Sequence, residues 1–120
     1  MSVPVDLTAL ASLIDELGPE TLLATITTDG RPHIVSVVAQ WGDGTIGCPG
    51  GRRTRANVES NTAATLIWPM VRDDAYRLIV DGTATVDHEA ERISIIPTFA
   101  VLHRIATAPE GGPTCVPVES

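Results

Sequence analysis

Residues 47–57 read GCPGGRRTRAN, and they place three arginines within four residues, directly after a Pro-Gly-Gly turn and at the start of an expected helix. Arginine presents a fixed fork of donors that matches phosphate oxygens. Paired glycines let backbone N–H groups turn toward an anion, and the start of a helix adds N–H groups that lack an acceptor. The stretch therefore predicts a phosphate pocket that contains Arg52 and Arg53.

The alternative interpretation is a solvated basic turn whose arginines pair with Asp29, Asp43 or Glu59, as surface arginines commonly do. The overall charge helps to choose a class of ligand. The 120 residues carry a net charge of −7, with 15 acidic residues against 8 basic ones. Such a chain lacks the basic face that nucleic acids require. A local group of cations in an acidic protein favours a small anionic ligand over a polymer.

Turn signals divide most of the chain into short segments rich in β-branched and apolar residues. Asp29-Gly30 is a strong hairpin signal, and residues 42–44 (GDG) mark a second turn. Strands are expected at residues 20–28, 32–40, 45–48, 63–68, 76–87 and 114–118, with a bulge or bend at Gly82. The pattern predicts one domain over residues 1–120, mainly β, built on a six-stranded antiparallel barrel with peripheral helices.

The helices are expected around this barrel. Asp6 is a good N-cap for a first helix, which Gly18-Pro19 ends. A second helix is expected over residues 53–60, ending at Asn61, because asparagine tolerates the left-handed conformation. Residues 89–96 predict a short helix that Pro97 interrupts, and residues 98–105 are expected to continue it at a new angle.

Several kinds of catalytic or metal site are not expected. His33, His88 and His103 lack the spacing of metal ligands. Ser36 has no nucleophile elbow around it, and the sequence has neither a P-loop nor a dinucleotide-binding glycine motif followed by a parallel βαβ unit. No metal site is therefore predicted, and no catalytic side chain is singled out.

Cysteine use and hydropathy bear on the compartment. Cys48 and Cys115 do not form a C-x-x-C pair, and we expect both to be reduced thiols. The sequence shows no secretory signal and no apolar run as long as a membrane span. A cytoplasmic protein is expected.

The order of these parts resembles the pyridoxamine 5′-phosphate oxidase-like family of FMN-binding split barrels. The resemblance rests on the combined order and spacing of several segments between about Thr21 and Val86: LATITT (23–28), DGRPH (29–33), IVSVV (34–38), GC (47–48), GGRRTRAN (50–57) and ATLIWP (64–69). It implies a homodimer of split β-barrels with one flavin site at each end of the shared interface.

The resemblance also implies the residues of that site. Arg52 and Arg53 would hold the cofactor phosphate, and Thr54 and Arg55 in the same turn would assist. The second strand would line the flavin ring through His33, Ile34, Val35, Ser36 and Val37. Trp68 and its neighbours would cover the site of the partner chain.

Two features of the true pyridoxamine phosphate oxidases are missing: a lysine near Val38 at the end of the second strand, and an arginine-rich C-terminal segment. Short members of the family that use FMN or the deazaflavin coenzyme F-420 are the closer likeness. We therefore expect an FMN-binding oxidoreductase that transfers hydride to or from a small substrate.

Two alternatives stay open: an F-420-dependent reductase of the same fold, and a non-catalytic flavin- or haem-binding protein. Two arginines match the charge of the single FMN phosphate. Glu59 would repel the acidic tail of F-420 if it faced the groove, and this favours FMN.

Overall fold

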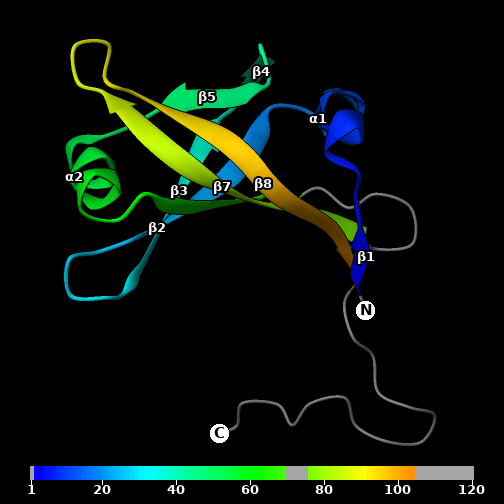
Figure 1. The fold of residues 1–120 in the computed structure, drawn as a ribbon, viewed down its shortest axis with the longest axis horizontal. Helices are drawn as coiled ribbons and strands as arrows, with labels where there is room; N and C mark the ends of the chain where they lie inside the picture. The colour runs from blue at the N-terminus through cyan, green and yellow to red at the C-terminus, as the bar shows by residue number, and fades with distance from the viewer. Residues whose placement is uncertain (1, 70–75, 105–120) are drawn as a thin grey trace, which may run out of the picture.

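The computed structural model describes residues 2–69 and 76–104, and most of them lie in one curled antiparallel sheet (Figure 1). Its strands in this part of the chain are β1 (Ser2–Pro4), β2 (Glu20–Ile26), β3 (Pro32–Val38), β4 (Gln40–Gly42), β5 (Thr45–Pro49), β6 (Ala63–Ile67), β7 (Tyr76–Asp87) and β8 (Arg92–Arg104). The mainly β, antiparallel split barrel is thus confirmed, with more strands than the six expected. The strand predicted at 114–118 lies outside the described residues.

The order of the strands brings the start of α2 (Arg52–Ser60) next to β3. The order is β3-β2-β6-β7-β8-β5-β4, and β1 pairs with β8. The predicted hairpin joins β2 to β3, and β3 at one end of this order also contacts β5 near the other end. Because α2 follows β5 directly, this contact places the arginine-containing turn beside the second predicted strand.

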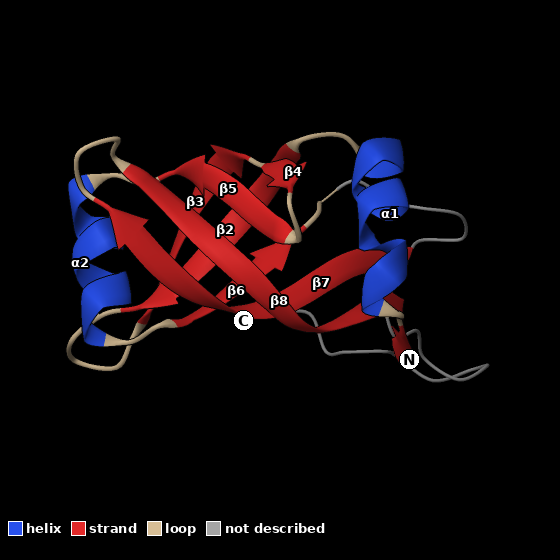
Figure 2. Cartoon of the chain, turned by 45° about the horizontal axis from the view of Figure 1, so that its top comes forward, coloured by secondary structure: helices blue, strands red, loops and turns tan. Residues whose placement is uncertain are grey.

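Two helices close opposite ends of the curled sheet in the described part of the chain (Figure 2). α1 (Leu10–Leu17), preceded by the 3-10 turn η1 (Leu7–Ala9), buries Leu10, Leu13, Ile14 and Leu17. The Asp6 carboxylate accepts a hydrogen bond from the Thr8 backbone N–H at 3.0 Å, which confirms Asp6 as an N-cap. Neither helix is long and apolar enough to cross a membrane.

The helices predicted over residues 89–96 and 98–105 are wrong, because β8 is a strand that pairs with β7 along nearly its whole length. Its first half alternates between buried side chains, at Ile93 and Ile95, and exposed ones. This period of two is typical of a strand with one face on the core. Backbone pairing with β7 overrides the weak local preference for a helix.

A bend in the β7–β8 pair accommodates the proline that suggested a helix break. Pro97 lies opposite Gly82, where the register shifts between Asp81 and Gly82. A Cβ atom at Gly82 would lie 2.6 Å from the carbonyl oxygen of Ile96, so the close approach of the two strands requires glycine there. The bend predicted at Gly82 is confirmed.

The second helix has the predicted extent, but its end differs in conformation. Asn61 is the C-cap of α2 and has extended backbone angles (φ −149°, ψ 115°), not left-handed ones. Its side-chain oxygen accepts a hydrogen bond from the Ala63 N–H at 3.0 Å. Asn61 therefore directs the chain straight from the helix into β6.

Candidate functional site

A pocket of about 860 Å³ lies where β3 faces the start of α2. Its lining includes His33, Val35, Ser36 and Val37 from β3, and Arg52, Arg53 and Thr54 from α2. The volume is in the range of sites that hold small organic ligands. The structure therefore brings most of the residues suggested by the resemblance into one pocket.

The first turn of α2 presents free backbone donors to this pocket. Gly51 is the N-cap, and no side chain caps the helix there. The first helical hydrogen bond runs from the Arg55 N–H to the Gly51 carbonyl oxygen at 2.9 Å. The N–H groups of Arg52, Arg53 and Thr54 therefore have no acceptor within the helix. Donors arranged in this way suit an anion.

The charges of this turn are the reverse of those that stabilise an isolated helix. Negative side chains are favourable at a helix N-terminus and positive ones are unfavourable. The first turn of α2 has no acidic residue and begins with Arg52 and Arg53. A bound anion would interact favourably with both the arginines and the helix N–H groups, and would offset the unfavourable arrangement.

The two glycines before the helix differ in the space around them. A Cβ atom at Gly50 would lie 2.5 Å from Cγ1 of Ile93, so the packing against β8 excludes a side chain there. A Cβ atom at Gly51 would have no heavy atom within 4 Å. Gly51 thus leaves open space next to the free N–H groups.

The ion pairs expected for a solvated basic turn are absent from the described residues. Arg52 and Arg53 are exposed and form no ion pair there. The carboxylates named in that alternative lie elsewhere: Asp29 Oδ2 is 3.8 Å from Arg31 Nε, Glu59 Oε2 is 2.6 Å from His88 Nε2, and Asp43 lies in the turn between β4 and β5. Both guanidinium groups are therefore available to a ligand.

His33 contributes the least satisfied polar group of the pocket lining. Its Nδ1 atom is buried and has no hydrogen-bond partner in the described part of the chain. A buried polar atom without a partner costs free energy. A ligand group that formed this hydrogen bond after a small rotation of the ring would remove that cost.

Buried contacts fix α2 on the sheet. Its inner face buries Thr54, Asn57 and Val58. The Asn57 side-chain amide donates a hydrogen bond to the Thr25 hydroxyl oxygen at 3.1 Å, and both side chains are buried. This bond joins the helix to β2 and holds its N-terminus at the pocket.

Three of the suggested residues do not line the pocket: Ile34, Arg55 and Trp68. Ile34 is 54% exposed on β3, outside the pocket lining. The Arg55 side chain is only 14% exposed and points away from the pocket, toward the Gly50 carbonyl and the β7–β8 turn. The resemblance implied that Arg55 would assist Arg52 and Arg53 in holding the phosphate, but its side chain does not line the pocket.

Trp68 does not lie at a surface that a partner's ligand could reach. Its side chain is fully buried, and its Nε1–H donates a hydrogen bond to the Gly18 carbonyl oxygen at 2.8 Å. The prediction that Trp68 covers the partner's site is therefore wrong, because this side chain fills the core of its own protomer.

β2 supplies a part of the pocket that was not predicted from the sequence. Glu20, Thr21 and Leu22 line it, and in the antiparallel register Glu20 lies opposite Val38 and Leu22 opposite Ser36. The predicted Asp29-Gly30 hairpin could have identified these β2 residues, because a short turn sets which residues of the two strands lie opposite each other.

Thiol and metal chemistry have little support in the described residues. Burial raises the pKa of the Cys48 thiol to about 11, and the nearby Arg92 charge opposes this only in part. A buried thiol that stays protonated is a poor nucleophile. No group of three or more His, Cys, Asp or Glu side chains in residues 2–69 and 76–104 is placed to hold a metal ion.

Comparison with known proteins gives one pair of close relatives. No family model matches the chain. The uncharacterised proteins Mb0449c of Mycobacterium bovis and MT0457 of Mycobacterium tuberculosis are each 34% identical to it, over 85% of this chain and 82% of the relative.

Several solved structures share the fold at low sequence identity. A general stress protein 26-related protein of the pyridoxinephosphate oxidase family from Clostridium acetobutylicum has a TM-score of 0.63 (14% identity, 83% of this chain and 91% of that one). The FAD-binding protein from Mycobacterium smegmatis has a TM-score of 0.61 (16% identity, 87% of this chain and 100% of that one). An F420 reductase has a TM-score of 0.54 (18% identity, 69% of this chain and 90% of that one). At these identities the likeness shows the fold alone.

Proposed function

We propose that this chain binds FMN and acts as an oxidoreductase. The premise is that it belongs to the family of the two mycobacterial proteins and has the split-barrel fold of the pyridoxamine 5′-phosphate oxidase-like proteins. One observation carries the proposal. Arg52 and Arg53, which form no ion pair with any residue that the structure describes, meet the free N–H groups of α2 and the open space at Gly51 in one pocket beside β3.

The residues present fit a flavin phosphate. Arg52 and Arg53 would hold it together with the first N–H groups of α2, and β3 would support the ring through Val35 and Val37. A bound flavin would supply the hydride chemistry, so that the protein has to bind, orient and shield it. The substrate is a small molecule of unidentified class, and the cytoplasmic location and single-domain organisation stay predictions.

The choice of FMN over the deazaflavin coenzyme rests on charge. Glu59 does not contribute to it as the sequence suggested, because its carboxylate is held by His88 outside the pocket lining. Glu20 does line the pocket and is exposed. Its negative charge disfavours an acidic tail on that side, whereas the single phosphate of FMN is matched by the two arginines.

Titration of the apo-protein tests this proposal. We expect FMN to quench the protein fluorescence with a Kd in the micromolar range or below, and the purified holoprotein to show a flavin absorbance spectrum. The same titration with F-420 and with haemin supplies the comparison. Micromolar binding of F-420 or haemin with none of FMN would overturn the choice of cofactor, and binding of none of the three would overturn the proposed function.

We further propose that the protein is a homodimer. Ile34 and Val38 on β3, and Ile96 and Phe99 on β8, are each more than half exposed. Large apolar side chains exposed on strands are buried by a two-fold partner in many dimers. Light scattering at micromolar concentration should therefore give a mass near twice 12.7 kDa. A monomer that binds FMN at full occupancy would contradict a site shared between subunits.

A further inference from the structure

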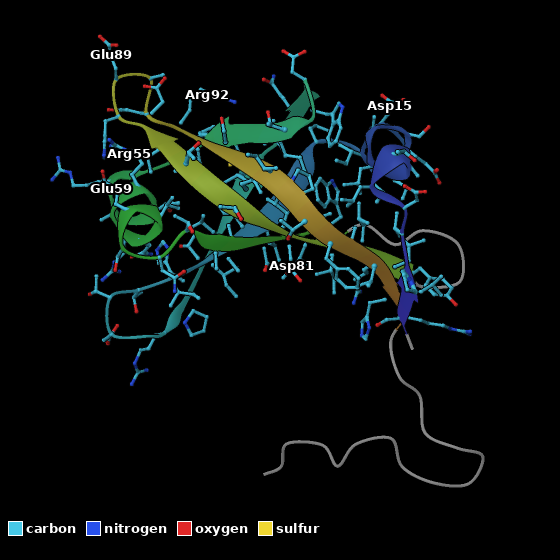
Figure 3. The ribbon with its side chains drawn as sticks, viewed as in Figure 1. Asp15, Arg55, Glu59, Asp81, Glu89 and Arg92 are labelled. Atoms are coloured by element: carbon cyan, nitrogen blue, oxygen red, sulfur yellow. The ribbon has the colours of Figure 1, made fainter. Side chains whose placement is uncertain are left out.

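Arg55 connects the pocket-forming turn to the tip of the β7–β8 hairpin. Its Nε–H donates a hydrogen bond to the Gly50 carbonyl oxygen at 3.0 Å, and its Nη1 lies 3.1 Å from Nδ1 of His88. Its Nη2 is 4.0 Å from a carboxylate oxygen of Glu91. Figure 3 shows Arg55 and Glu59 on α2, on the side that faces the turn carrying Glu89.

Gly50 is held from both sides by this arrangement. Its N–H donates a hydrogen bond to the Glu91 carbonyl oxygen at 3.0 Å, while its own carbonyl accepts from Arg55. The position that a side chain would occupy is filled by Ile93. Gly50 directly precedes Gly51, so these bonds fix the direction in which the chain enters the first turn of α2.

His88 completes the connection. A guanidinium group only donates hydrogen bonds, so the Nδ1 atom that faces Arg55 must be the acceptor. The proton is then on Nε2, which lies 2.6 Å from the Glu59 carboxylate in the last turn of α2. His88 thus joins Arg55 to Glu59, and the hairpin tip is bonded to both ends of the helix.

We propose that Arg55 is a positioning residue for phosphate binding, acting through Gly50 and supported by His88, and not a direct ligand of the phosphate. The inference rests on the proposed function, because it concerns the same pocket. Arg55 orders the Gly50-Gly51 segment, so that the N–H groups of α2 and the side chains of Arg52 and Arg53 point at one anion before it binds. Such pre-organisation increases affinity, because less ordering remains to be done on binding.

The test compares two ligands that differ only in the phosphate, FMN and riboflavin. Arg55→Met keeps the aliphatic stem but removes every donor. We expect it to weaken FMN binding about tenfold while riboflavin affinity changes by less than about twofold. General damage to the fold would lower both affinities, so their ratio isolates the phosphate. His88→Gln, which can still accept from Arg55 and donate to Glu59, should keep most of the wild-type ratio, and His88→Ala should not.

Arg31→Ala is the matched control, since Arg31 is an exposed arginine of the β2–β3 turn that pairs only with Asp29 among the described residues. It should leave both affinities unchanged. An Arg55→Met protein that keeps the wild-type ratio of FMN to riboflavin affinity would overturn the positioning role while leaving the proposed function intact.

A measurement without ligand keeps the inference testable if FMN does not bind. In the apo-protein, the Gly50 amide, whose N–H is bonded to the Glu91 carbonyl oxygen, should exchange its hydrogen faster in Arg55→Met than in wild type, and at the wild-type rate in Arg31→Ala. Equal exchange in all three proteins would overturn the inference independently of any cofactor. Failure of wild type to bind FMN, with faster exchange in Arg55→Met, would overturn only the proposed function.

Discussion

Replacing Arg52 and Arg53 together with alanine is expected to weaken FMN binding by at least about a hundredfold. A hydrogen bond to a charged group contributes about 1.5–3 kcal/mol, so each single replacement should cost roughly ten- to a hundredfold. The two guanidinium groups are exposed, line the pocket and have no competing ion pair in the described residues. Titration of each apo-protein with FMN, followed by fluorescence, measures the effect.

The stability of the same variants separates this site from a solvated turn. Positive charges at the N-terminus of α2 are unfavourable, so removal of either arginine should leave the apo-protein equally stable or more stable by about 0.3–1 kcal/mol. Lower affinity together with unchanged or higher stability is the signature of a binding residue. On the alternative of a solvated turn, FMN affinity would change by less than about twofold in both variants and in the Arg31→Ala control.

The sequence contained enough information for most of the barrel. The strands expected at 20–28 and 32–40 are separated by a glycine-containing turn, and β-branched residues are frequent in both of them and in the strand at 76–87, so local preference and tertiary structure agree. Residues 92–104 are different. Their alternation is hidden by the adjacent apolar pair Ile95 and Ile96 and by Pro97, and only pairing with β7 identifies the strand.

The candidate site was predictable to the extent that it depends on backbone order. The turn at residues 50–54 and the strand at 33–37 meet because β3 contacts β5, a closure that the resemblance implied. The directions of individual side chains were not predictable. Arg55 lies in the same cluster as Arg52 and Arg53, but its bond to His88 depends on a hairpin tip 33 positions away.

Trp68→Ala is expected to reduce the free energy of unfolding by about 3–5 kcal/mol, the usual cost of removing a buried large aromatic side chain. The side chain is fully buried next to the end of α1, and its Nε1–H is bonded to the Gly18 carbonyl oxygen. The variant leaves a cavity and also an unpaired carbonyl group. For a domain of this size we expect a fall in Tm of about 15 °C or more.

Trp68→Phe and Trp41→Ala test whether the destabilisation comes from lost packing in the core. Trp68→Phe keeps most of the buried ring but loses the hydrogen bond, so it should be destabilised by about 1–2 kcal/mol. Trp41 is only partly buried, so Trp41→Ala should reduce the free energy of unfolding less than Trp68→Ala does. Urea unfolding followed by circular dichroism at one protein concentration compares the variants. If Trp68 instead covered a partner's ligand, Trp68→Ala would lower FMN affinity while the free energy of unfolding kept its wild-type value. A side chain at such an interface contacts the ligand and does not pack in the barrel interior.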